Sequence, residues 1–187
     1  MARNKPNDDT PEAEMAKILI VPGLRNSGPT HWQTWFETQL PDTHRVEQAD
    51  WERTCLSDWA ARVREKIDAI GEAVWIVAHS FGCLAAVTAA FERPQQILGA
   101  LLVAPADPHR FGEPTVLLEE KLQFPSLVVA SSNDPWVKAN AAEFWAGQWG
   151  SDFLNIGAAG HINVDSGHGP WPDGLQFFEH LRANQAL

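Results

Sequence analysis

Residues 74–82 read Val74-Trp75-Ile76-Val77-Ala78-His79-Ser80-Phe81-Gly82. The stretch begins as a short apolar, β-branched run, which is typical of a strand buried in a parallel sheet. It passes without a loop into a serine flanked by small residues, and this pattern predicts a strand, a sharp turn and a helix. Ser80 would then lie on a strained corner above the carboxyl end of the sheet, at the N-terminus of the next helix.

A serine on such a corner is a nucleophile elbow. The residues two before and two after it have to be small because the strand and helix backbones crowd each other there, and here they are Ala78 and Gly82. The usual pattern has glycine at both places, so Ala78 is a mild departure. The alternative interpretation is that Ser80 is an ordinary helix N-cap that follows a strand.

Length and composition limit the class of protein. A chain of 187 residues with 44% hydrophobic and 20% charged residues has the size and composition of one globular domain. We expect a flexible tail over residues 1–16 and a single domain over residues 17–187. The net charge of −10, without a dense Lys/Arg cluster, argues against nucleic acid or an anionic membrane as a partner.

The cysteines and the N-terminal segment bear on cofactors and compartment. Cys55 and Cys83 have no metal-binding or redox spacing, and we expect no cofactor. Residues 1–17 are polar and lack the apolar segment of a signal peptide. No stretch reaches the roughly 18 uncharged apolar residues that a membrane span needs. The expectation is a soluble, cytoplasmic protein.

Strand and helix patterns alternate along the chain. Apolar runs predict strands at residues 17–23, 43–49, 98–103, 125–131 and 152–156, in addition to the strand that enters the elbow. Helical spacing predicts helices at residues 31–40 with Thr30 as cap, 57–70 with Ser57 as cap, 81–92, 133–149 with Pro135 in the first turn, and 172–184. Residues 157–169 form a glycine-rich loop.

This alternation predicts an α/β fold with an about six-stranded parallel sheet and helices on both faces. Ligands bind such sheets at the carboxyl ends of the strands, where the strand order reverses. If the order is second, first, third, fourth, fifth, sixth, the reversal lies between the first and third strands. The loop at Leu24 and the elbow at Ser80 would then face each other.

Two other residues can complete a catalytic site around Ser80. A serine hydroxyl needs a base to take its proton, and that base needs a carboxylate that fixes its tautomer. Asp134 and His161 follow the fifth and sixth predicted strands and give the chain order Ser, Asp, His, which α/β-hydrolases use. Asp107, after the fourth strand, is the competing acid.

The remaining histidines have simpler interpretations. His79 is expected to point away from Ser80 on the sharp turn. His161 and His168 with Asp165 between them resemble a metal site, but a fourth ligand and a rigid helix are missing. We therefore expect no metal here and expect Asp165 and Ser166 to hold the loop. The histidines without a spacing partner are His31, His44, His109 and His180.

An oxyanion hole would complete the site. One donor is expected to be the backbone N–H of Phe81, the residue after the serine, and the other the N–H of Leu24 in the loop after the first strand. The expected reaction is attack of Ser80 on a carbonyl, an acyl-enzyme, and its release by water activated through His161.

Six separated motifs together resemble one family. They are Val21-Pro22-Gly23-Leu24, Ser27-Gly28-Pro29 with His31-Trp32, Ala78-His79-Ser80-Phe81-Gly82, Val103-Ala104-Pro105, Ser131-Ser132-Asn133-Asp134-Pro135 and Gly160-His161-Ile162-Asn163. The chain from residue 17 onward is similar to small α/β-hydrolases of the YdeN and retinoblastoma-binding protein nine type. That resemblance implies catalytic Ser80, Asp134 and His161, serine hydrolase activity and no cofactor, and it says little about the substrate.

The substrate is expected to be a small or medium ester, thioester or amide. Only about 20 residues, 104–124, separate the fourth and fifth predicted strands, so the lid is minimal. Candidate pocket walls are Trp32, Phe81, Phe111 and Trp136, because pockets are mostly apolar. Two alternatives stay open: a catalytically weak binding or interaction protein with this fold, and acyl transfer to an acceptor other than water.

Overall fold

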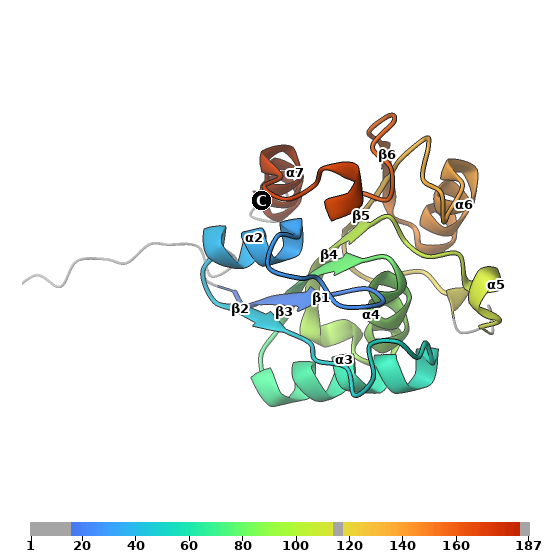
Figure 1. The fold of residues 1–187 in the computed structure, drawn as a ribbon. Coiled ribbons are helices and arrows are strands. Elements are labelled where there is room, and N and C mark those ends of the chain that lie inside the picture. The colour runs from blue at the N-terminus through green and yellow to red at the C-terminus, as the bar shows by residue number, and fades with distance from the viewer. Residues whose placement is uncertain (1–15, 114–117, 184–187) are drawn as a thin grey trace, which may run out of the picture.

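The computed structural model describes residues 16–113 and 118–183. Within these residues six parallel strands form one sheet, as predicted, and their order is β2-β1-β3-β4-β5-β6, the order considered above (Figure 1). The reversal of strand order lies between β1 and β3, which places the loop after β1 next to the elbow. The strands are β1 Ile18–Val21, β2 Thr43–Arg45, β3 Val74–His79, β4 Ile97–Val103, β5 Ser126–Ala130 and β6 Asp152–Asn155.

Helices cover both faces of the sheet. Helices α2 and α7 lie on one face and α3 lies on the other (Figure 1). Each crossover therefore buries an apolar helix face against a strand layer that is itself apolar on both sides. The helices are α2 Trp32–Gln39, α3 Leu56–Ile70, α4 Phe81–Glu92, α5 Pro108–Phe111, α6 Ala139–Trp149 and α7 Pro172–Ala183, with 3-10 turns η1 Pro94–Gln96 and η3 Val164–Ser166.

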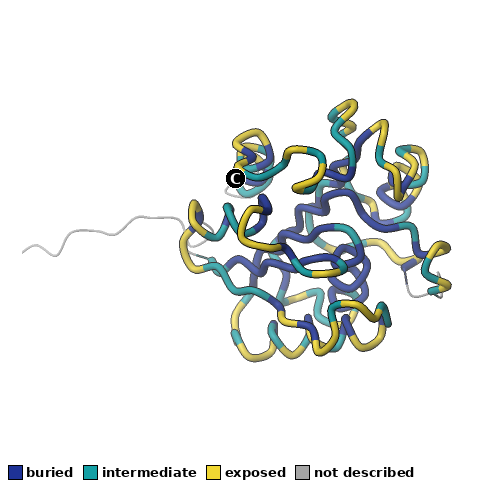
Figure 2. Tube along the Cα trace, viewed as in Figure 1, coloured by how far each residue is buried: buried dark blue, intermediate teal, exposed yellow. Residues whose placement is uncertain are grey.

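Two hydrophobic cores hold the layers together. One joins α3, α4 and α6 to the sheet through side chains such as Trp59, Leu84 and Trp149. The other joins α2 and α7 to the opposite face through side chains such as Trp32 and Phe178. Figure 2 shows the strands buried at the centre and the exposed residues on the outer turns of the helices. The central strands β1 and β3 are buried along their whole length.

Three helix starts differ from the prediction. Helix α2 is capped by His31, whose ring accepts from the Gln33 amide, and not by Thr30. Helix α3 starts after Cys55 without a side-chain cap, so Ser57 lies inside the helix. Helix α6 begins at Ala139 because Lys138 is extended, so the predicted start at residue 133 is wrong. The predicted tail over residues 1–16 lies, apart from residue 16, outside the described residues.

Among the residues described, no helix combines the length and apolar character that crossing a membrane requires.

The elbow between β3 and α4 leaves no room for a side chain at Gly82. A Cβ at this position would overlap the carbonyl oxygens of Val21 and Pro22 at the end of β1. Backbone atoms cannot move aside as a flexible side chain can, so the space demands glycine. The neighbouring Ala78 is fully buried in β3, and its methyl group is accommodated there.

We predict that Gly82→Ala lowers the free energy of unfolding by about 1–3 kcal/mol, the usual cost of overpacking. Gly147→Ala is the matched control, because Gly147 lies inside α6 with nothing within 4 Å of an added Cβ. The same substitution should raise the free energy of unfolding there by about 0.5–1 kcal/mol through helix propensity. Urea unfolding measures both changes. Equal stability of Gly82→Ala and the parent would contradict the close approach.

Candidate active site

Ser80 occupies a strained backbone position at the elbow. Its φ of 53° and ψ of −125° lie outside the regions that ordinary L-residues favour, which costs on the order of 1–3 kcal/mol. Backbone hydrogen bonds hold it there: its N–H donates to the Val103 carbonyl at 3.0 Å, and its carbonyl accepts from Cys83 at 3.0 Å and from Ala106 at 3.2 Å. The Ser80 side chain makes no cap hydrogen bond to α4, so it is not an ordinary N-cap.

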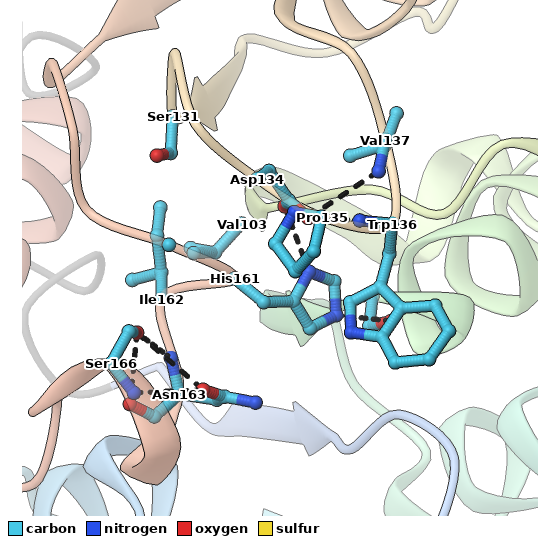
Figure 3. Close-up of polar contacts among 12 residues, drawn as sticks. Val103, Ser131, Asp134, Pro135, Trp136, Val137, His161, Ile162, Asn163 and Ser166 are labelled. Atoms are coloured by element: carbon cyan, nitrogen blue, oxygen red, sulfur yellow. Dashed lines mark hydrogen bonds and ion pairs between the residues drawn. The ribbon is translucent and has the colours of Figure 1, made fainter.

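The Ser80 hydroxyl belongs to a continuous chain of hydrogen bonds. Its Oγ lies 2.9 Å from Nε2 of His161. The other ring nitrogen of His161, Nδ1, lies 2.8 Å from Oδ2 of Asp134, and Figure 3 shows this contact. The structure thus brings together three residues that lie far apart in the sequence, each at the carboxyl end of a different strand.

Asp134 is held by the loop of residues 131–138, which we call the Asp134 loop. Its side chain has no exposed surface, and its Oδ1 accepts from the amides of Trp136 at 2.8 Å and Val137 at 3.3 Å. Three donors therefore compensate for removing this carboxylate from water. The competing acid, Asp107, instead caps α5 and accepts from the His109 amide.

His161 lies in the loop of residues 157–168, which we call the His161 loop. Ile162 has a φ of 49°, an unfavourable value for a β-branched residue. Its carbonyl accepts from Nε1 of Trp32 at 2.8 Å. The Trp32 ring has no exposed surface and packs on Phe36 and Trp171. Trp32 was predicted to be a pocket wall, but it lies in the core and holds the His161 loop.

Two polar side chains tie the Asp134 loop to the His161 loop. Ser131 Oγ accepts from the Ala159 amide at 2.9 Å. Asn133 Oδ1 accepts from the Gly160 amide at 2.7 Å and from the Ser131 hydroxyl at 2.9 Å. Because both loops are joined through backbone amides, Asp134 and His161 keep a fixed spacing.

Sequence reasoning missed two buried polar residues beside the site. The Nε2 atom of His79 lies 3.0 Å from the His161 carbonyl oxygen, and the His79 ring lies 4.9 Å from the His161 ring, centroid to centroid. Gln33 is fully buried in α2, and its amide nitrogen donates to the carbonyls of Val21 and Val77, at 3.2 and 3.1 Å. Their partners are remote in sequence, so no local pattern indicated either role.

The expected oxyanion donors lie on the two sides of the elbow. Phe81 is the first residue of α4, and the first amides of a helix have no intrahelical acceptor. Leu24 lies in a turn closed by the hydrogen bond from the Asn26 amide to the Gly23 carbonyl. A Cβ on Gly23 would come within 2.8 Å of the Ser80 Cβ, so this turn packs directly against the serine.

Two other predicted pocket residues differ in exposure. The Trp136 ring is 58% exposed, and in Figure 3 its indole projects from the Asp134 loop on the same side as the His161 ring. Phe111, in α5, is partly buried and packs on Phe81, with ring centroids 5.0 Å apart. Phe81 itself is fully buried, so its side chain belongs to the core and does not form an open pocket wall.

The glycine-rich segment around His168 does not assemble a metal site. Within residues 16–113 and 118–183 there is no group of three or more His, Cys, Asp or Glu side chains that could hold a metal ion. Ser166 instead accepts from the Asn163 amide at 3.0 Å and lies 3.1 Å from Nδ1 of His168. Ser166 therefore holds the His161 loop, as expected.

A sequence model of one family covers most of the chain. The serine hydrolase model matches residues 18–180. The chain belongs to the serine hydrolase family. A search among curated proteins gave no match.

Solved structures support the assignment of this chain to the serine hydrolase family. A protein described as a YdeN-like hydrolase from Pectobacterium atrosepticum is 35% identical, with a TM-score of 0.87 over 93% of this chain and 95% of the other. The ydeN gene product of Bacillus subtilis is 20% identical, with a TM-score of 0.75 over 90% and 99%. Est1E from Butyrivibrio proteoclasticus, solved with ferulic acid bound, is 14% identical, with a TM-score of 0.70 over 96% and 91%. The last two share the fold. The resemblance to YdeN is confirmed.

Burial keeps two histidines of this serine hydrolase neutral. Burial is the main cause that lowers the pKa of His31 to about 3, with Arg45 and His161 adding to it. Burial, followed by the nearby His31 and His161, lowers the pKa of His79 well below its ordinary value. In the unfolded chain both groups titrate near their ordinary pKa of about 6.5. The folded state therefore binds fewer protons than the unfolded state below this pH.

We predict that the free energy of unfolding falls as the pH drops below about 6.5, because only the unfolded histidines then become protonated. His31, whose pKa in the folded state is about 3, contributes a loss of about 2 kcal/mol between pH 7 and pH 5, and His79 adds to this loss. The His31→Asn variant keeps an N-cap acceptor but lacks one of the two buried imidazoles. Its free energy of unfolding should therefore fall by about 2 kcal/mol less between pH 7 and pH 5 than that of the wild type. Urea unfolding at pH 7, 6 and 5 measures the effect, with the exposed His180→Asn as control. An unchanged pH dependence in His31→Asn would refute the prediction.

Proposed function

We propose that Ser80, His161 and Asp134 form the catalytic triad of a hydrolase that acts on small or medium acyl esters, thioesters or amides through an acyl-enzyme. The observation that carries the proposal is the unbroken chain of contacts from Ser80 Oγ to His161 and on to the Asp134 carboxylate, at 2.9 and 2.8 Å. These distances are within the range at which a base can take the proton of a nucleophile.

The contacts support a definite distribution of protons. An ionised carboxylate only accepts hydrogen bonds, so Nδ1 of His161 carries a hydrogen and donates it to Asp134. In neutral histidine the other nitrogen, Nε2, is then unprotonated and accepts from the Ser80 hydroxyl. As Ser80 attacks a carbonyl carbon, His161 takes its proton and later returns it to the leaving group. Asp134 stabilises the imidazolium that forms in between.

The developing oxyanion would be bound by the amides of Phe81 and Leu24. The amide of Phe81 also lies at the N-terminus of α4, whose dipole favours negative charge. A water molecule deprotonated by His161 would then release the acyl group. Apart from this water molecule, all the groups in these steps belong to the described residues.

The substrate class is inferred from the surroundings of the site. Among the described residues between β4 and β5, which exclude 114–117, the regular helix is the short α5, and a short connection of this kind favours small or medium substrates. Trp136 offers exposed apolar surface next to Asp134. Arg110 fixes its position, since Nη1 donates to the Trp136 carbonyl at 2.8 Å and the guanidinium lies 5.7 Å from the ring centroid.

We predict that a fluorophosphonate probe labels Ser80 and that Ser80→Ala abolishes labelling. His161→Ala should slow labelling by on the order of 10²–10⁴, the range of general-base catalysis. Asp134→Asn should slow it strongly because Nδ1 loses its anionic acceptor, whereas Asp107→Asn, which retains a capping side chain, should label at the wild-type rate. Intact mass and peptide mapping over time measure the rates. Equal rates in the two Asp→Asn variants would refute the assignment of the acid.

We predict that Trp136→Ala lowers kcat/KM on medium-chain p-nitrophenyl esters by on the order of tenfold, because an apolar wall is lost. Short-chain esters, which do not reach the wall, should lose less. Phe144→Ala is the matched control, because Phe144 is 56% exposed but lies on α6. A panel of acyl chain lengths gives the comparison. No chain-length preference in the wild type, or equal losses in both variants, would contradict Trp136 as a pocket wall.

A further inference from the structure

We propose that His79 is a positioning residue for His161: its imidazole holds the His161 backbone through the carbonyl oxygen and thereby sets the distance between Nε2 of His161 and Oγ of Ser80. The inference rests on the proposed function of the triad. His79 lies at the end of β3, directly before Ser80. It is therefore carried by the same rigid strand as the nucleophile, while its partner belongs to the opposing His161 loop.

The contact assigns the tautomer of His79. A carbonyl oxygen only accepts, so the 3.0 Å contact between His79 Nε2 and the His161 carbonyl requires a hydrogen on Nε2. A donor at this nitrogen is present in the neutral ring, and neutral histidine leaves Nδ1 unprotonated. His79 therefore acts as a fixed hydrogen-bond donor and takes no proton from the substrate.

The surroundings favour a donor that stays uncharged. The ring of His79 lies between those of His31, at 5.0 Å, and His161, at 4.9 Å. The titratable groups that act on it are His31 from the start of α2, and His161 and His168 from the His161 loop. None of these side chains is an acid that could stabilise a second positive charge. When His161 becomes an imidazolium during the reaction, a neutral neighbour avoids repulsion at close range.

The bond from His79 acts together with the bond from Trp32. The His161 and Ile162 carbonyls are consecutive, and they accept from His79 Nε2 and Trp32 Nε1 at 3.0 and 2.8 Å. Trp32 comes from α2, however, whereas His79 comes from the strand that carries Ser80. Only the His79 contact links base and nucleophile through one short, rigid piece of backbone.

The test compares the fluorophosphonate labelling rates of His79→Leu and His79→Gln with that of the wild type. Leucine fills space but has no donor, and a misplacement of about 1 Å can cost 10²-fold, so labelling should slow roughly 10- to 100-fold. The glutamine amide nitrogen can take the place of Nε2, so His79→Gln should recover most of the rate. Its acidic limb in a pH–rate profile should match that of the wild type, because a neutral His79 does not titrate there.

Three results would overturn the inference about His79 while leaving the proposed function intact. The first is wild-type labelling of His79→Leu. The second is a His79→Gln variant as slow as His79→Leu. The third is an equal slowing of Val63→Ala, a core variant in α3 that reduces stability without touching the His161 loop. Urea unfolding of each variant supplies the stability comparison, and His79→Asn, whose amide is too short to reach the carbonyl, replaces His79→Leu if that variant does not fold. Absence of labelling at Ser80 in the wild type would overturn the proposed function and this inference together.

Discussion

The packing of the elbow against the end of β1 is the constraint on which the site depends. Gly82 admits the carbonyls of Val21 and Pro22, and Gly23 in turn lies against the Ser80 side chain. With backbones this close, the chain can pass from β3 into α4 only through a strained residue, and Ser80 takes that position. The same packing places the turn that contains Leu24 next to the start of α4, the two segments from which we propose the oxyanion donors. The strain is therefore not an isolated defect, because the backbone partners of Ser80 on β4 and in the following loop hold it in place.

Side chains that take no part in the proposed reaction hold the His161 loop in its position relative to Ser80 and Asp134. The His161 loop would be free to move if only the Ser80 and Asp134 contacts held it. Donors from two other elements, His79 and Trp32, bind its carbonyls, and acceptors from the Asp134 loop bind its amides. Backbone groups of an irregular loop need such partners when they are buried. The partners that satisfy the loop also position its histidine, so stability and geometry have the same origin.

Sequence reasoning succeeded where the signal was local and failed where the partner was distant. Apolar runs and the chain order of Ser80, Asp134 and His161 were enough to predict the parallel sheet and the loops that carry the site, whereas the strand order of the sheet was assumed and agrees with the structure. The cap of α2 was misassigned because a histidine can accept from an amide as Thr30 could have done. Trp32 was predicted to be a pocket wall, and no role beyond pointing away from Ser80 was predicted for His79. Only the folded chain shows that their N–H groups reach carbonyls 130 and 82 residues away.

The proposed triad and the proposed pocket wall lie in different parts of this serine hydrolase. In the proposed triad the Asp134 side chain is fully buried and that of His161 is 10% exposed, whereas Ser80 is partly exposed. The exposed apolar surface near the site lies instead on Trp136. Arg110 in α5 holds this residue through its backbone carbonyl, so α5 orients the proposed pocket wall. A change at Arg110 would alter the support of Trp136 while leaving the hydrogen bonds of Ser80 and His161 in place. Substrate preference can therefore diverge within such a fold through very few residues, while the buried contacts keep the reaction the same.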